Sequence, residues 1–84
     1  MIKVLYFAAI REDLNCSEEE LEPGTTIKNI ADLKRLLAER ENQWQAVFSD
    51  NKQPLSSINQ VIAKDDQIIN DGDEVAFFLP VTGG

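Results

Sequence analysis

Glu74-Val75-Ala76-Phe77-Phe78-Leu79, residues 74–79, is a run that predicts a β-strand with apolar side chains on both faces. A second such run opens the chain over residues 1–9. Its alternating positions place Ile2, Val4 and Tyr6 on one face and Leu5, Phe7 and Ala9 on the other. Strands that are apolar on both faces are typical of the inside of a sheet. We therefore expect the first and last strands to pair in parallel at the centre of a mixed sheet.

One long helix is predicted between these strands, from Asn29 to Arg40. Asn29 is a favourable N-cap residue, and Asp32 suits the positive end of the helix dipole. A buried stripe is expected at helical spacing, formed by Ile30, Leu33, Leu36 and Leu37. The charged residues of the other face, Arg40 among them, are expected to be solvated. The helix should thus pack across one face of the sheet.

The remaining segments complete the predicted layout. Residues 11–15 form a polar break with a possible helical turn, and residues 17–22 predict a more exposed strand before a Pro23-Gly24 turn. Residues 43–48 predict a short helix in which Trp44 serves packing. A loop over 51–54, a strand over 58–63 and an Asp71-Gly72 turn lead to the final strand. This ββαββ order predicts an α+β protein with the β-grasp, or ubiquitin-like, fold: a mixed sheet with one main helix on one face.

Composition narrows the classes of function. Eighty-four residues suffice for one small domain, and the formal net charge of −7 argues against nucleic-acid binding and favours basic partners. We expect no membrane association and a cytoplasmic location, because no apolar run is long enough to span a bilayer and residues 1–9 do not read as a signal sequence. The single cysteine, Cys16, cannot form an internal disulfide and agrees with a reducing compartment.

Catalysis by the chain's own side chains is not expected. The sequence contains no histidine and no carboxylate group with ligand spacing, so neither a metal site nor a Ser-His or Cys-His pair is predicted. No phosphate-binding glycine loop is present, and no bound cofactor is expected. Cys16 has no neighbouring base in the sequence and is interpreted as a structural or incidental thiol.

Beyond Leu79, the sequence Pro80-Val81-Thr82-Gly83-Gly84 predicts a flexible tail, so we divide the chain into a domain over residues 1–79 and an extended tail over 80–84. Pro80 ends the ladder and stiffens the exit direction. The diglycine would let the terminal carboxylate enter a narrow channel. After conversion to an acyl-adenylate, the carbonyl of Gly84 could be attacked by an amine or by sulfur. A frayed terminus or a cleavage scar remains the alternative.

The sequence resembles the MoaD-type sulfur carriers, the small subunits of molybdopterin synthase. The resemblance rests on residues 1–8 with Arg11-Glu12, on Ala31-Asp32-Leu33 and Asn59-Gln60, and above all on residues 71–78 followed by 80–84. Leu79 departs from the family, which usually has a second proline there.

Several expectations follow from the resemblance alone. It implies that an activating enzyme adenylates Gly84 with ATP and that the residue becomes a thiocarboxylate. It also implies a large subunit that takes up the tail and receives sulfur for a cyclic pyranopterin, in a heterotetramer of two small and two large subunits. Gly83 and Thr82 would line the threaded segment, and Val81, Pro80 and Phe78 would guide it and dock on the partner.

Two other classes of function remain open at this stage. A carrier with the same activation could serve thiamin synthesis, tRNA thiolation or conjugation to lysines. Alternatively, the chain could be a plain β-grasp interaction module whose acidic surface binds a partner without chemistry.

Overall fold

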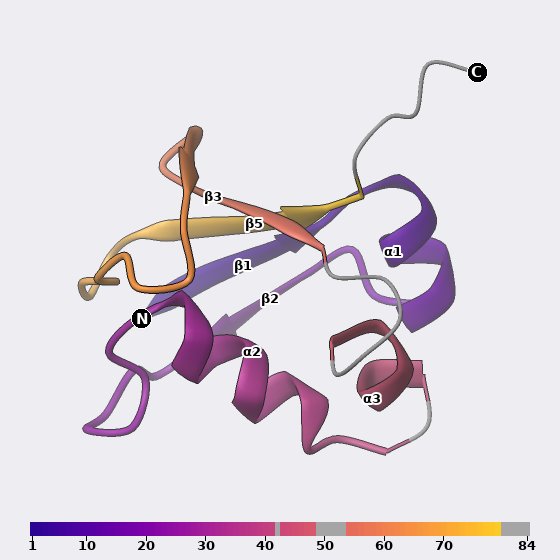
Figure 1. The fold of residues 1–84 in the computed structure, drawn as a ribbon, viewed down its shortest axis with the longest axis horizontal. Coiled ribbons are helices and arrows are strands. Elements are labelled where there is room, and N and C mark those ends of the chain that lie inside the picture. Colours follow the sequence, from indigo (N-terminus) through magenta and orange to yellow (C-terminus); the bar gives the residue numbers. More distant parts are fainter. Residues whose placement is uncertain (42, 49–53, 80–84) are drawn as a thin grey trace.

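The computed structural model describes residues 1–41, 43–48 and 54–79. These residues form a five-stranded sheet with α2 and α3 on one side and α1 at the end where β1 finishes (Figure 1). The elements, in chain order, are β1 (Ile2–Tyr6), α1 (Ala8–Leu14), β2 (Glu18–Leu21), α2 (Ile30–Ala38), α3 (Gln43–Phe48), β3 (Leu55–Ile58), β4 (Val61–Ala63) and β5 (Glu74–Phe78).

The strand order of the sheet is β2-β1-β5-β3-β4, so the last strand in the sequence is the central one. β5 pairs in parallel with β1, with Val4 opposite Val75 and Tyr6 opposite Phe77. β5 pairs antiparallel with its other neighbour, β3, and the two outer pairs, β1–β2 and β3–β4, are also antiparallel. The predicted α+β, β-grasp architecture with parallel terminal strands at its centre is therefore confirmed.

Helix α2 packs on the sheet and begins where the sequence predicts. The side chain of Asn29 accepts a hydrogen bond of 2.8 Å from the backbone N–H of Asp32, as an N-cap should. Ile30, Leu33 and Leu37 are fully buried. Leu36 was predicted to be buried with them but is 36% exposed. It lies at the edge of the apolar stripe, and the sheet covers only the middle of that stripe.

The core lies between the sheet and the helices. Its largest fully buried side chains include those of Tyr6 and Phe77 on adjacent central strands. The short helix α3 matches its predicted bounds and buries Val47 and Phe48, while Trp44 is half-buried and packs against the same cluster. The prediction that Trp44 serves packing is therefore confirmed.

Burial on both faces of the first strand was a wrong prediction. β1 ends at Tyr6, since the backbone turns to a positive φ of 51° at Ala8 and α1 begins there, which places Ala9 in a helix. Phe7 is 45% exposed, and Leu5 is only half-buried. The physical reason is that the described helices α2 and α3 pack on the other face of the sheet (Figure 1).

The strand expected over residues 58–63 is also wrong, because the chain reverses direction within it. Asn59 and Gln60 have φ values of 50° and 70° and form a two-residue turn between β3 and β4. β3 extends back to Leu55, so the described sheet has one strand more than the ββαββ layout.

The other predicted segments agree with the structure where it describes them. A helix occupies most of the polar break, an edge strand lies within residues 17–22, and turns form at Gly24 and at Gly72, whose φ is +91°. Most of the predicted loop over 51–54 and all of the tail over 80–84 lie outside the described residues, so the division into a domain and a tail stays a prediction. None of the described helices is long and apolar enough to cross a membrane.

Candidate docking face at the end of the central strand

The face of the sheet opposite the helices carries an apolar patch. Side chains alternate along β1 and β5, so the residues that flank the buried Tyr6 and Phe77 point to this other face. We call this side of the sheet the open face; its apolar side chains include Leu5, Phe7, Leu55 and Phe78, with the buried Ser57 and Ala76 between them.

Phe78 lies at the end of β5, where the chain continues toward residues 80–84. It is half-buried and lies opposite Leu55 of β3, which is 42% exposed. On the other side, the backbone N–H of Phe7 donates a 3.2 Å hydrogen bond to the carbonyl of Phe77, which brings the exposed Phe7 to the same end of the sheet. Exposed apolar side chains at the start of a tail form a surface that a partner could cover while taking up that tail.

Of the predicted site residues, Phe78 alone lies within the described part of the chain. Pro80, Val81, Thr82, Gly83 and Gly84 lie outside the described residues, and their roles stay predictions. Phe78 lies on the open face, and its docking role stays a prediction.

Charge on the open face increases away from the tail. The row next to the apolar patch pairs Lys3 of β1 with Glu20 of β2 and Glu74 of β5. The Nζ of Lys3 lies 3.7 Å from a carboxylate oxygen of Glu18, an exposed ion pair that contributes little to stability. Among the described residues, the face thus changes from apolar at the end of β5 to mainly acidic at its start.

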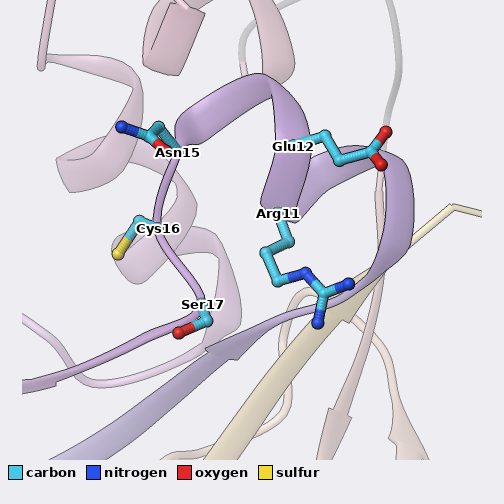
Figure 2. A pocket seen from close by; sticks show the side chains of 5 residues that line it. All are labelled: Arg11, Glu12, Asn15, Cys16 and Ser17. Carbon is cyan, nitrogen blue, oxygen red and sulfur yellow. The ribbon is translucent and has the colours of Figure 1, made fainter.

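A shallow pocket of about 340 Å³ lies between α1 and β2 and contains the single cysteine (Figure 2). Figure 2 shows the Cys16 thiol and the Arg11 guanidinium pointing in different directions. Burial, and next the charge of Glu19, raise the pKa of the Cys16 thiol, so the thiolate is disfavoured. The structure thus supports the interpretation of Cys16 as a structural or incidental thiol.

No cluster of potential metal ligands occurs in the part of the chain that the structure describes. The candidate site in the described residues is therefore the apolar surface of the open face at the end of β5.

A polar network lies on the helix side of the sheet, behind this site. Arg40 donates two hydrogen bonds, of 2.8 and 2.9 Å, to the carboxylate of Glu19, and the hydroxyl of Tyr6 donates a third of 2.6 Å. Burial of Glu19 opposes its ionisation, but the hydrogen bonds from Arg40 and Tyr6 outweigh it and lower the pKa of the carboxyl group. The expectation that Arg40 is simply solvated is therefore wrong.

This network predicts a pH dependence of stability. A carboxyl group with a lowered pKa in the folded state stabilises the protein above its ordinary value of 4.5, and this contribution is lost as the pH falls through the folded value. We expect Glu19→Gln to lower the free energy of unfolding by about 1–2 kcal/mol at pH 7, the size of a charge-assisted hydrogen bond. The loss should shrink at a pH below the folded value. Urea denaturation of both proteins at pH 7 and at a pH below the folded pKa of Glu19 measures this loss. An equal loss at the two pH values would contradict a stabilising role of the ionised carboxylate.

Sequence reasoning missed two members of the open face. The sequence pattern predicts that Phe7 is buried in the first strand, and it predicts no strand at Leu55. The segment Leu55-Ser56-Ser57-Ile58 places one apolar residue and one serine on each face, so it lacks the apolar–polar alternation that indicates a strand, although both serines are buried.

Comparison with known proteins defines the class of this molecule as a small sulfur carrier. The model of the ThiS family matches residues 4–84. The chain is 38% identical over 84 residues to the molybdopterin synthase sulfur carrier subunit of Escherichia coli, and the alignment covers all of both chains.

Solved structures show the same fold. SAMP1 from Haloferax volcanii superimposes with a TM-score of 0.70 at 18% identity, covering 99% of this chain and 98% of that one. A protein–protein complex of subunits 1 and 2 of molybdopterin-converting factor from Helicobacter pylori contains a chain that matches with a TM-score of 0.66 at 19% identity, covering 99% and 97%.

The chain therefore belongs to the ThiS family, in the group of molybdopterin synthase sulfur carrier subunits, and its function is that of a sulfur carrier in molybdenum cofactor biosynthesis.

Proposed function

We propose that Gly84 is the residue that carries the sulfur. An activating enzyme would join the carboxylate of Gly84 to AMP, with release of pyrophosphate from ATP, and a sulfur donor would then displace AMP to leave a thiocarboxylate. The observation that carries this proposal is the full-length similarity to the E. coli sulfur carrier subunit, with a family match that extends to residue 84. The central position of β5 supports it, because a rigid strand leads directly into the tail.

The chemistry assigned to this chain needs no side chain of its own. A thiocarboxylate is ionised at neutral pH and is already a nucleophile, so it requires no general base. A sequence without histidine fits this chemistry. The groups that bind and activate the cyclic pyranopterin would then belong to the large subunit, and the small subunit would not be catalytic alone.

The open face is our candidate for the surface that the large subunit covers. Phe7, Leu55 and Phe78 lie at the end of the sheet from which the tail continues, so one partner could bury them and receive Gly84 at the same time. The Helicobacter pylori chain with this fold was solved in a complex of subunits 1 and 2, which supports a corresponding pair here. We propose a heterotetramer of two small and two large subunits, located in the cytoplasm.

The function is tested by reconstitution. The protein isolated from its native cell is examined by mass spectrometry for replacement of one terminal oxygen by sulfur. The thiolated protein is then mixed with the large subunit and a cyclic pyranopterin. Formation of the dithiolene of molybdopterin is the expected result. A thiolated protein that the large subunit leaves unchanged, or Gly84 found in isopeptide bonds to lysines of many proteins, would contradict the proposal.

The docking surface makes a separate prediction. Leu55→Asp places a charge among the apolar side chains of the open face, and we expect it to weaken binding to the large subunit by about tenfold or more, or roughly 1.4 kcal/mol. Val61→Asp is the matched control, because Val61 is 69% exposed on the edge strand β4 and belongs to the other face of the sheet. Isothermal titration calorimetry measures both variants, and equal loss of affinity would contradict the assignment of the open face.

A further inference from the structure

Four aromatic rings pack together on the helix side of the sheet beneath the end of β5. The ring of Phe77 is stacked at 6.2 Å on Tyr6 and meets Phe48 edge-on at 5.0 Å, measured between ring centroids. Trp44 contacts Tyr6 at 5.3 Å and Phe48 at 6.3 Å. Phe77 immediately precedes Phe78, so the rings that support Phe77 also fix the backbone of the last residues of β5.

Arg40 contacts the ring cluster through Trp44. Its guanidinium carbon lies 4.4 Å from the centroid of the Trp44 ring, while its two nitrogens bond both carboxylate oxygens of Glu19. The same carboxylate accepts the hydrogen bond from Tyr6, whose side chain is almost entirely buried. The contacts therefore form a closed circuit from Arg40 through Glu19, Tyr6 and Trp44 back to Arg40, which links α3 and β2 to the central strands.

We propose that Arg40 is a positioning residue for sulfur transfer, acting through Glu19 and Trp44 on the ring cluster that supports Phe77 and hence on the direction in which the chain leaves β5. The inference rests on the proposed function, because it assumes that Gly84 has to reach a reacting group on a partner. A displacement of about 1 Å at a reacting group can cost roughly a hundredfold in rate, so delivery of Gly84 would depend on how firmly the end of β5 is held.

The chemistry of the circuit requires arginine at this position. A planar guanidinium can bond both carboxylate oxygens and stack on an indole ring at the same time, whereas an ammonium group is a point charge without the fork. Arg40→Lys should therefore retain the charge and recover only part of the positioning, and Arg40→Met should lose it.

Lys34 provides a control on α2, the helix that ends two residues before Arg40. Its ammonium group lies 2.7 Å from a carboxylate oxygen of Asp65, and its side chain is 19% exposed compared with 33% for Arg40. Lys34→Met thus removes an ion pair of similar length, although its partner Asp65 is 64% exposed whereas Glu19 is 21% exposed. Among the described residues, the cation that contacts the ring cluster is Arg40 and not Lys34. Arg40→Met should lose more thermal stability than Lys34→Met, because Glu19 is more buried than Asp65, so the two variants are compared after correction for their difference in global stability.

The first measurement is amide hydrogen exchange of the free, full-length protein. Arg40→Met should increase exchange at Phe77, Phe78 and Leu79 by about tenfold relative to Lys34→Met, because local opening of these residues loses its support. Exchange at these amides that is the same in the two variants would overturn the proposal. This readout does not depend on any partner or on the proposed function.

The second measurement is single-turnover sulfur transfer from thiolated protein to a cyclic pyranopterin at varied concentrations of large subunit. Arg40→Met should lower the maximal rate about tenfold with the half-saturating concentration of large subunit unchanged, Arg40→Lys should lie between, and Lys34→Met should match the unsubstituted protein. An unchanged maximal rate in Arg40→Met would overturn the proposal. Failure of the unsubstituted thiolated protein to deliver sulfur would instead overturn the proposed function, while the exchange measurement would still decide the positioning.

Discussion

Removal of Gly83 and Gly84 should abolish sulfur delivery and leave the free energy of unfolding unchanged. The reacting carbonyl would be lost, and the new terminal residue, Thr82, carries a side chain that a narrow channel built for glycine would not admit. Stability should not change, because the described core is built from residues up to Leu79, and a terminal pair contributes little packing. Thiocarboxylate formation followed by mass spectrometry measures the first effect, and urea denaturation the second.

Two further variants sharpen this test. Gly84→Ala keeps the carboxylate and adds a single methyl group, so impaired transfer at unchanged stability would show that the channel excludes side chains. A chain with several residues appended beyond Gly84, and not trimmed, should also be inactive. Retention of function after the deletion would favour a plain interaction module over a sulfur carrier.

Phe77→Ala should produce the largest loss of stability. The Phe77 side chain is fully buried between Tyr6 and Phe48, and its removal would leave a cavity under the central strand. Truncation of a buried phenylalanine typically costs about 3–5 kcal/mol, a large part of the roughly 5–15 kcal/mol that stabilises a domain. We expect a large fall in the urea midpoint and loss of function through unfolding.

Phe78→Ala is the control for this substitution. The two phenylalanines are adjacent on β5, but Phe78 is half-buried and lies on the open face. Its truncation should cost much less stability and should weaken binding to the large subunit. Equal destabilisation by the two substitutions would mean that the open face is as tightly packed as the core, contrary to the structure.

Much of the fold could be predicted from the sequence because local and global signals agree. Asn29 caps α2 as its residue type predicts, and the apolar run before Leu79 becomes the central strand. The error in the first strand has a physical cause. An apolar residue in a strand indicates a side chain that avoids water, but it does not tell whether a helix of the same chain or another protein provides the cover. Phe7 was therefore assigned to the core, although it is exposed.

The candidate site was predictable only in part. Residues 80–84 and Phe78 follow from the closing segment of the sequence, but Leu55 reaches the open face through the pairing of β3 with β5, which no local pattern specifies. Arg40 has a similar origin, because its partner Glu19 lies on a strand 21 residues away and the helix pattern alone predicts a solvated cation. Contacts between distant segments decide both positions, and they become visible only in the folded sheet.

The parallel pairing of β1 with β5 has a consequence for how the molecule is made. The first strand leaves the ribosome early, yet its inner neighbour in the sheet is the last strand to be translated. Pairing of strands that are distant in the sequence costs loop entropy before the stabilising contacts form. Assembly of the complete sheet therefore requires residues 74–78 and is expected to be slow. A chain whose translation stops short of β5 would lack the central strand of the sheet and would be exposed to proteases.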